Sequence, residues 1–490
     1  TNLTMKKCGF NLDCSYSKLP DFFFTKIAPK KVESPKLVLL NNNLTKLLDL
    51  DFSMIDENLK ADLFSGNILP PKSKPISQAY AGHQFGNFSI LGDGRAVLIG
   101  EHINTSNEKF DIQFKGSGTT PYSRSGDGRA ALSPMLREYL ISEAMHFLNI
   151  PTTRSLAVTS TGEKVFREKA FPGAILTRIA SSHIRVGTFQ YAAFKGSLKL
   201  QKKLLDYTIS RHFNDIKDSE YPGLQFLKSM MLKQIDLTIN WMRVGFIHGV
   251  MNTDNMSVNG ETIDYGPCAF MDYYNPNTCF SSIDYNKRYS FENQKIITQW
   301  NLARFAETLL PFLDKSIKKS VNIAQEIIES FNDCFSEKWK IMMKCKLGIL
   351  NSEKGDSKII DDLLLWMEKN AVDYTNTFYH LTSEKKLVDP IYNSKSFNNW
   401  YKNWMNRIKR NDKPLTDAFK VMRNHNPRVI PRNHIVEESL LDLSENNDSK
   451  SFNELIKLLS APYNYDKNIK NKYILPNLDK TYFYETFCGT

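Results

Sequence analysis

The sequence lacks several features that would place it in a specialised class. Its seven cysteines never form a Cys-x-x-Cys pair and their number is odd, so they predict neither a zinc ribbon nor a secreted disulfide framework. No apolar run approaches the roughly 18 residues that a membrane span needs. No apolar stretch of signal-peptide length follows the early lysines. We therefore expect a soluble protein of a reducing compartment, the cytoplasm, with no membrane partner.

Composition excludes unusual architectures. The 490 residues are 41% hydrophobic, 12% aromatic and 24% charged, which excludes a disordered, collagenous or coiled-coil chain. No repeat of roughly 20–50 residues is visible. Lysine and arginine exceed aspartate and glutamate by a net charge of +11. Because these charges are dispersed along the chain, we expect a solvated surface and no nucleic-acid partner. We also expect a monomer.

Differences in composition along the chain predict four parts. Residues 1–76 carry short apolar runs among Asn, Lys and Pro and form an N-terminal extension. Residues 77–195 are rich in glycine and short β-type runs, which indicates a sheet. Residues 196–345 show apolar side chains every three or four positions, which indicates helices. Residues 346–490 continue as helices and include a polar Asn- and Lys-rich stretch over 408–480. The predicted fold class is α+β.

Individual elements follow from periodicity and capping signals. Ser133 suits a helix N-cap and Pro134 the first helical position, so we predict a helix that starts there and ends before Asn-Ile-Pro at 149–151. A long helix is expected over 224–242. Strands are expected at 87–91, 96–99, 110–114 and 156–159, and further helices over 298–345 and 358–382.

Two copies of GDGRA, at 92–96 and 126–130, form the first candidate site. Glycines let backbone N–H groups approach phosphate oxygens, and Lys115, Arg124 and Arg129 add positive charge nearby in the sequence. Neither copy matches the GxxxxGK[ST] pattern of a P-loop. A pair of hairpin turns is the alternative, because Asp-Gly is a strong hairpin signal.

A lysine and a glutamate form the second candidate site. Lys115 closes the predicted strand DIQFK, and Glu138 lies in the helix that is expected to begin at Ser133. Protein kinases pair a strand lysine with a helix glutamate to hold the α- and β-phosphates of ATP. A solvated helix face at Glu138 is the alternative.

The third candidate site is the segment 245–272, GFIHGVMNTDNMSVNGETIDYGPCAFMD. Kinase-like phosphotransferases hold Mg²⁺ with the Asn of a catalytic loop and the Asp of a later D-F-G turn, which places Asn255 and Asp264 at the metal positions. Val250 occupies the position of the catalytic aspartate, and valine accepts no proton. Asp254 is a replacement carboxylate in the same loop. A pair of Asn- and Asp-rich turns is the alternative.

Two arginines, Arg178 and Arg185, would lie about two helical turns apart if LTRIASSHIRVG formed a helix. Both guanidinium groups would then share one face and clamp a polyphosphate. A pair of surface salt-bridge donors is the alternative.

Taken together, five segments resemble the selenoprotein O family of protein adenylyltransferases. They are QAYAGHQFGNFSILGDGRA, DIQFKGSGTTPYSRSGDGRAALSPMLREYLISEAM, LTRIASSHIRVGTFQYAA, GFIHGVMNTDNMS and DYGPCAF, and the resemblance returns in NPRVIPRNHIVEE and the final FCGT. The resemblance implies a two-lobed protein-kinase-like, or pseudokinase, fold that binds ATP in a flipped orientation. It further implies transfer of AMP to Ser, Thr or Tyr hydroxyls of protein substrates, with release of pyrophosphate.

The resemblance also implies roles for individual residues. Asp254 is similar to the family's proton acceptor, and Asn255 and Asp264 are similar to its Mg²⁺ ligands. Glu138 looks like the partner of Lys115. The positions similar to the family's nucleotide site are Gly92, Gly94, Arg95, Lys115, Asp127, Gly128, Glu138, Arg178, Arg185 and Asp264.

The terminal cysteine departs from some eukaryotic relatives, which carry selenocysteine near the chain end. Here Cys488 stands in an ordinary FCGT, as in bacterial relatives. The resemblance implies redox control through an intramolecular disulfide of this cysteine, with Cys279 or Cys268 as the partner.

Three other functions stay open alongside AMP transfer. A kinase would transfer the γ-phosphate, but it must explain Val250 at the base position. A non-catalytic nucleotide-binding pseudokinase must explain why Asp254, Asn255 and Asp264 are all present. UMP transfer from UTP with Mn²⁺ would use the same residues as AMP transfer from ATP with Mg²⁺.

Overall fold

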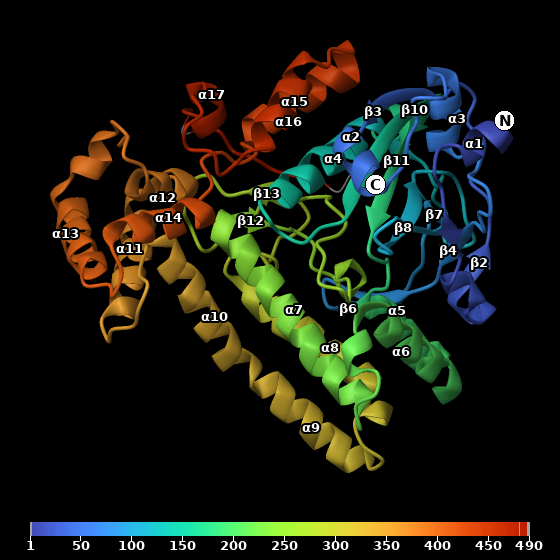
Figure 1. The fold of residues 1–490 in the computed structure, drawn as a ribbon, viewed down its shortest axis with the longest axis horizontal. Coiled ribbons are helices and arrows are strands. Elements are labelled where there is room, and N and C mark those ends of the chain that lie inside the picture. Colours follow the sequence, from blue (N-terminus) through green and yellow to red (C-terminus); the bar gives the residue numbers. More distant parts are fainter. Residues whose placement is uncertain (1, 480, 488–490) are drawn as a thin grey trace.

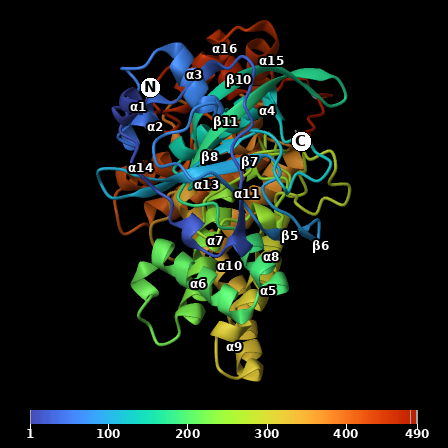
Figure 2. The ribbon, with the colours of Figure 1, turned by 90° about the vertical axis from the view of Figure 1, so that its right-hand side faces the viewer.

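The computed structural model of the chain describes residues 2–479 and 481–487, a sheet-rich part followed by a helix-rich part (Figure 1). The strands gather at one end of the molecule, and the helices between residues 198 and 425 extend away from them, whereas those from residue 433 onward return to the sheet end (Figures 1 and 2). The predicted α+β class is confirmed. No helix among the described residues is long and apolar enough to cross a bilayer.

A nine-stranded antiparallel sheet organises the first part. Its strands are β1 (Leu12–Asp13), β2 (Phe24–Lys26), β3 (Lys36–Leu40), β4 (Ile76–Gln78), β7 (Ala96–Ile103), β8 (Lys109–Lys115), β9 (Ala130–Ala131), β10 (Arg154–Phe166) and β11 (Ala170–Ala180). The main path runs β2-β4-β7-β8-β11-β10-β3, while β1 pairs with β7 and β9 with β11. In the register, Ala96 and Leu176 flank Lys115, so the candidate lysine lies on a central strand.

Two small antiparallel pairs accompany the sheet. A hairpin joins β5 (Ala81–Gln84) to β6 (Asn87–Ile90), and β12 (Phe246–Ile247) pairs with β13 (Ala269–Phe270) across the segment that carries the third candidate site. The four strands expected from the sequence are confirmed as β6, β7, β8 and β10.

The helix after the sheet's glycine loops, α4 (Leu132–Phe147), does not start where its sequence predicts. Its N-cap is Ala131, with an extended backbone and no side-chain cap, so the prediction of a cap at Ser133 and a start at Pro134 is wrong. The reason is the strand before it. Because β9 pairs with Gly173 and Ala174 of β11, the backbone stays extended through Ala131 and turns helical directly afterwards.

Separate apolar cores cover the two faces of the sheet. Successive strand residues point to opposite sides, so Ile175 of β11 packs in one core while Leu176 packs in the other. The Ile175 core is covered from the N-terminal region, which folds as α1 (Asn2–Lys6), α2 (Asn42–Leu47) and α3 (Glu57–Ser65). The Leu176 core is covered by α4 together with helices from the C-terminal region.

The remaining helices form the second part of the chain. They are α5 (Val186–Lys195), α6 (Leu198–His212), α7 (Pro222–Val244), α8 (Asn293–Leu309), α9 (Ile317–Glu329), α10 (Phe331–Lys346), α11 (Asp356–Asn370), α12 (Tyr374–Thr382), α13 (Lys395–Lys409), α14 (Leu415–His425), α15 (Asn433–Asn446), α16 (Lys450–Leu459) and α17 (Asn471–Ile474). The long helix expected over 224–242 is confirmed as α7, which ends at Gly245 with φ +79°.

Two predicted helical stretches divide into shorter helices. The stretch 298–345 becomes α8, α9 and α10, and the stretch 358–382 becomes α11 and α12. The polar stretch 408–480 contains α14 to α17, and α15 and α16 pack on α4. The division of the chain into four parts stays a prediction.

Candidate functional site

The centre of the candidate site is an ion pair between the sheet and its covering helix. Lys115 lies at the end of β8, and its Nζ is 2.7 Å from Oε2 of Glu138 on α4. Glu138 is 1% exposed, so its charge depends on buried cationic partners, which are Lys115 and Arg178, whose Nη1 lies 3.0 Å from Oε1. The structure therefore brings together the two residues of the second candidate site, and the alternative of a solvated face at Glu138 is wrong.

The two candidate arginines do not share a helix. Arg178 lies on strand β11, opposite Gln113 of β8, and Arg185 is the N-cap residue of α5. The helical interpretation is therefore wrong, because β11 needs an extended backbone to pair with β8 and β10. The guanidinium groups converge nevertheless, since each donates to Asp264 at 2.7 Å. Both side chains are buried, so the alternative of surface salt bridges is also wrong.

Asp264 is surrounded by positive charge. Its Oδ1 lies 2.7 Å from Nη1 of Arg178 and 3.4 Å from Nζ of Lys115, and its Oδ2 lies 2.7 Å from Nη1 of Arg185. Burial opposes ionisation, but the three cations together hold the pKa of Asp264 well below its ordinary value. The backbone at Asp264 has φ +61°, a left-handed conformation, so the chain turns sharply at this residue.

Asp254 has the opposite environment. It lies in the short 3₁₀ turn Thr253–Asn255, is 7% exposed, and its buried Oδ1 has no hydrogen-bond partner among the described residues. Gly82 of β5 packs so closely that a Cβ there would overlap this oxygen. Burial raises the pKa of Asp254 to about 7, although the nearby Arg185 opposes the shift. The turn thus holds a carboxyl group whose proton affinity suits a general base near neutral pH.

Asn255 and Asp264 carry oxygen atoms of the kind that a hard divalent cation binds, although both carboxylate oxygens of Asp264 already accept from arginines. Asn255 donates from Nδ2 to the carbonyl of Val250 at 3.0 Å, which leaves its amide oxygen as the acceptor. Mg²⁺ and Mn²⁺ prefer oxygen ligands, and Asn255 and Asp264 supply an amide and a carboxylate oxygen. Within residues 2–479 and 481–487, no group of three or more His, Cys, Asp or Glu side chains forms a metal site by itself. Water or phosphate oxygens would therefore have to complete the coordination.

The two GDGRA copies lie in interlocking loops at one end of the sheet. The amide of Gly116 donates to the carbonyl of Arg95 at 2.7 Å, and the amide of Gly118 donates to the carbonyl of Gly128 at 2.9 Å. A Cβ at Gly128 would overlap the backbone of Gly118, and one at Gly92 would overlap the ring of Tyr122. Close packing of the loops therefore requires glycine at both positions.

Charged side chains of these loops bind protein groups. Asp127 accepts from Arg167 at 2.9 Å, which helps to lower its pKa. Arg129 lies 3.5 Å from Glu163, and Arg124 donates to the carbonyl of Ile90. Arg124 and Arg129, which the sequence predicts as countercharge for phosphate, thus also contact groups of the protein.

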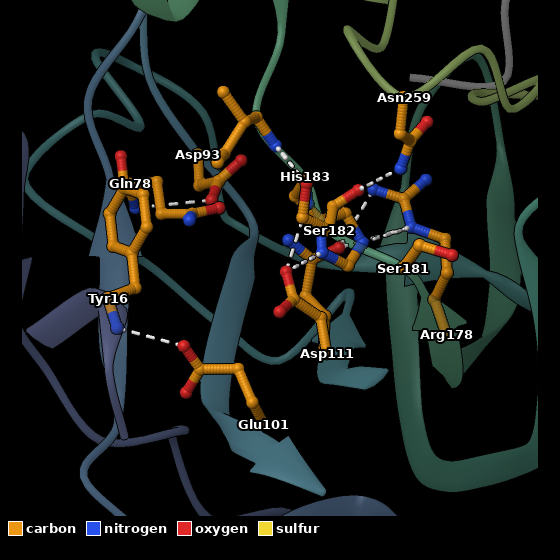
Figure 3. Close-up of polar contacts among 12 residues, drawn as sticks. Tyr16, Gln78, Asp93, Glu101, Asp111, Arg178, Ser181, Ser182, His183 and Asn259 are labelled. Atoms are coloured by element: carbon orange, nitrogen blue, oxygen red, sulfur yellow. Dashed lines mark hydrogen bonds and ion pairs between the residues drawn. The ribbon is translucent and has the colours of Figure 1, made fainter. Parts of the chain in front are cut away.

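A buried network behind Arg178 was not predicted from the sequence (Figure 3). Nε of Arg178 donates to Oε1 of Gln113 at 3.1 Å and to Nε2 of His183 at 3.3 Å. Nδ1 of His183 lies 2.8 Å from Asp111, which also binds Arg211 at 2.6 Å. Burial lowers the pKa of His183 to about 4, so the ring is neutral and accepts the arginine N–H. The network fixes the orientation of Arg178, and no local motif indicates it.

A second unpredicted contact joins the site to the C-terminal segment. Arg137, next to Glu138 on α4, donates to the carbonyl of Cys268 and, at 3.1 Å, to the hydroxyl of Tyr484. The hydroxyl of Thr486 donates to the carbonyl of Pro267 at 2.7 Å. Residues 481–487 therefore hold the loop that follows Asp264. Cys488, the cysteine of the redox prediction, lies outside the described residues.

The elements occur in the order of a kinase-like nucleotide site: lysine strand, glutamate helix, loop with Asn255, and turn with Asp264. Fold and site thus define a kinase-like nucleotide-dependent transferase class. A family profile described as "Protein adenylyltransferase SelO" matches residues 8–460. The chain belongs to this family, and it is an enzyme of the nucleotidyltransferase class.

Related proteins match this chain over nearly its whole length. It is 52% identical over 490 residues to protein nucleotidyltransferase YdiU of Nitrosococcus oceani, covering 100% of this chain and 99% of that protein. The proteins of the same name from Pelagibacter ubique and Bacillus mycoides are 52% and 50% identical, each covering 98% of this chain and 99% of the relative. A solved structure, ROP2 of Toxoplasma gondii, described as a virulence factor with a protein-kinase fold and no enzymatic activity, matches 68% of this chain and 86% of its own. Its identity to this chain is 7% and the TM-score is 0.23.

Proposed function

We propose that the chain transfers AMP from ATP to Ser, Thr or Tyr hydroxyls of protein substrates in the cytoplasm. The observation that carries the proposal is the buried Oδ1 of Asp254, which has no hydrogen-bond partner in the described part of the chain and lies in the turn beside Asn255. A buried polar atom without a partner costs free energy, so its presence calls for an explanation such as a missing substrate group. A substrate hydroxyl would supply the missing donor.

The chemistry of the step balances with the residues present. The acceptor oxygen forms a bond to the α-phosphorus, the bond from that phosphorus to the bridging oxygen of the β-phosphate breaks, and pyrophosphate leaves. The proton of the hydroxyl passes to the carboxylate of Asp254. Val250, at the position where kinases carry their base, takes no part.

Nucleotide phosphates would be held by the cations around Asp264. Lys115, Arg178 and Arg185 are oriented by protein partners, so they are positioned before a nucleotide arrives. The proposed nucleotide contacts are Gly92, Gly94, Arg95, Lys115, Asp127, Gly128, Glu138, Arg178, Arg185 and Asp264. Asn255 and Asp264 would hold Mg²⁺, or Mn²⁺, which when bound neutralises charge on the reacting phosphates.

Labelled nucleotides test the proposal directly. The full chain is incubated with substrate protein and ATP labelled at the α- or the γ-phosphate, each with Mg²⁺ or Mn²⁺, and with α-labelled UTP. Label on protein from α-labelled ATP alone is the expected result. Label from γ-labelled ATP would show a kinase, stronger label from UTP with Mn²⁺ would show UMP transfer, and nucleotide binding without label would show a pseudokinase.

Redox control through Cys488 is part of the same proposal, and of the two partner cysteines exposure favours Cys279. Thr486 contacts the neighbour of each, since its amide donates to the carbonyl of Phe280 at 2.8 Å and its hydroxyl to the carbonyl of Pro267 at 2.7 Å. Cys268 is buried at 0% exposure, whereas Cys279 is part-exposed. Burial raises the pKa of each thiol to about 11, so both would react slowly at neutral pH.

A further inference from the structure

A cluster of aromatic and basic side chains lies next to the Asp254 turn and has no role in the site described above. We call it the Trp300 face. Its members come from the β5–β6 hairpin, from α5, from α8 and from the loop before α8, and they are His83, Phe88, Phe194, Arg288, Trp300 and Arg304. The labels β6, α5 and α8 lie close together in both ribbon views (Figures 1 and 2).

The rings of the Trp300 face form a continuous chain of contacts. The ring centroids of His83 and Trp300 are 5.2 Å apart, as are those of His83 and Phe88 and those of Phe88 and Phe194. Phe194 is 64% exposed and Phe88 is 37% exposed. Exposed aromatic side chains that touch one another are typical of binding surfaces rather than of solvated ones.

Positive charge is concentrated at the Trp300 end. The guanidinium carbon of Arg288 lies 4.9 Å from the ring centroid of Trp300, and that of Arg304 lies 5.0 Å from it. Arg304 has an acidic neighbour, Glu307, at 2.9 Å. Arg288 has no carboxylate within ion-pair distance in the described part of the chain, and its buried Nε has no hydrogen-bond partner there. The face therefore presents an arginine whose charge is not balanced.

The Trp300 face is connected to the proposed base by direct contacts. The amide of His83 donates to Oγ1 of Thr253 at 2.7 Å, and Thr253 directly precedes Asp254. Nε2 of Gln190 lies 2.7 Å from Nδ1 of His83, and Oε1 of Gln190 accepts from Thr253 at 2.6 Å. A ligand on the Trp300 face would thus lie near the turn that carries Asp254.

We propose that the Trp300 face binds an acidic segment of the protein substrate and thereby selects which hydroxyl reaches Asp254. This inference rests on the proposed function. A glutamate or aspartate of the segment would pair with Arg288, whose planar guanidinium already stacks on Trp300 and so loses little freedom on binding. An apolar or aromatic side chain of the same segment would pack on Phe88 and Phe194.

A single-stranded nucleic acid is a less suitable occupant of the Trp300 face. Base stacking needs free aromatic faces. Two guanidinium groups already lie over Trp300, and the rings of His83 and Trp300 meet edge to face at 87°. A carboxylate would instead pair with the guanidinium group of Arg288, which has no ion-pair partner in the described part of the chain.

The test uses the full chain and a matched pair of peptides. Each peptide carries one acceptor serine and one nearby phenylalanine, and the flanking residues are glutamate in one peptide and glutamine in the other. Peptide binding is measured by fluorescence anisotropy, and AMP transfer from α-labelled ATP is measured separately. The variants are Arg288→Gln and Phe194→Ser, and Arg410→Gln serves as a control because Arg410 is exposed and pairs with Glu353, outside the Trp300 face.

We expect the wild-type chain to prefer the glutamate peptide by about tenfold in KM, and Arg288→Gln to abolish that preference without changing the KM for ATP. Phe194→Ser should weaken both peptides equally, and Arg410→Gln should change neither. A charge-reversed Arg288→Glu that prefers a lysine-flanked peptide would confirm the contact.

The outcomes separate this inference from the proposed function. Equal use of both peptides by wild type and Arg288→Gln, with AMP transfer intact, would overturn the docking role and leave the function standing. Charge-dependent peptide binding without nucleotide transfer from any nucleotide would overturn the proposed function and leave the docking role standing. An oligothymidylate that binds the face while neither peptide does would overturn the inference in favour of a nucleic acid.

Discussion

Two turns of the site carry the same chemical group in opposite states. Asp254 and Asp264 are both largely enclosed, yet burial raises the pKa of Asp254 to about 7 while three cations hold that of Asp264 well below its ordinary value. The difference is one of partners, since Arg178, Arg185 and Lys115 all contact Asp264, whereas Oδ1 of Asp254 has no partner within the described chain. One carboxyl group is thus kept ionised by its cationic partners, whereas the other can exchange a proton near neutral pH.

Replacing Asp264 should produce the largest effect. Asp264→Ala would leave the positive charges of Arg178 and Arg185 without their shared carboxylate, and breaking a buried ion pair costs about 3–5 kcal/mol. We expect that loss in the free energy of unfolding by denaturant titration, together with loss of AMP transfer to background. Asp236→Ala, which breaks an exposed pair with Lys338 on α10, is the control and should change neither. A stable Asp264→Ala enzyme would contradict the charge-balance argument.

Replacing Asp254 should affect catalysis alone. Asp254→Ala removes the base and should lower AMP transfer by roughly 10²–10⁴-fold. Calorimetry should show that ATP binding is largely retained. Raising Mg²⁺ or Mn²⁺ should partly restore Asp264→Ala but not Asp254→Ala. Equal rescue of the two variants would show that Asp254 is a metal ligand, and the distinction between the two turns would fail.

Weakening the nucleotide anchor should give a smaller effect. Lys115→Ala removes a charged hydrogen-bond donor, which is worth about 1.5–3 kcal/mol, so calorimetry should show ATP binding weakened by roughly 10- to 100-fold. Lys109→Ala changes the same strand at its other end, where Lys109 pairs with Asp13, and should leave ATP binding unchanged. Unchanged binding in Lys115→Ala would refute the kinase-like assignment of this lysine.

Lowering the pH should reduce the free energy of unfolding through His183, which contacts Arg178. Burial lowers the pKa of His183 to about 4 from an unfolded value near 6.5. Between these values the unfolded chain binds a proton that the folded chain excludes, so stability falls with falling pH by up to about 1.4 kcal/mol per unit. His183→Gln should remove this part of the slope in denaturant titrations at pH 7 and pH 5. Parallel slopes in the two proteins would contradict a neutral, buried His183.

Oxidation should have the smallest effect of the series. Under a mild oxidant the wild-type transfer rate should change slowly, because the candidate partner thiols are largely protonated at neutral pH. Cys488→Ser and Cys279→Ser should both abolish the change, while Cys334→Ser, on the remote helix α10, should respond like wild type. An identical response of Cys488→Ser and wild type would remove Cys488 from the proposal.

The parts of the site that the sequence predicted are those that depend on local pattern. Lys115 closes an alternating strand, and Glu138 lies within a long helical run, so the elements that carry them can be assigned from the sequence alone. Arg178 and Arg185 were assigned to the wrong element, because their seven-residue spacing suits a helix and nothing local reveals the pairing of β11 with β8.

Long-range contacts account for what the sequence did not predict. Asp111 and His183 meet only because β8 and the segment after β11 are neighbours in the folded sheet, and no spacing rule connects them. The start of α4 depends likewise on the pairing of β9, which a cap signal at Ser133 cannot reveal. Packing of α15 and α16 on α4 brings the apolar side chains of a largely polar stretch into the core.

The contacts of Tyr484 and Thr486 have a consequence for synthesis of the protein. A ribosome makes the chain from its N-terminus, so the strands, α4 and the Asp264 turn emerge long before the residues that hold Arg137 and Pro267. A nascent chain would carry its lysine, glutamate and aspartates without this support. The site would therefore reach its final geometry only once residues 481–487 have emerged from the ribosome and packed against Arg137 and Pro267.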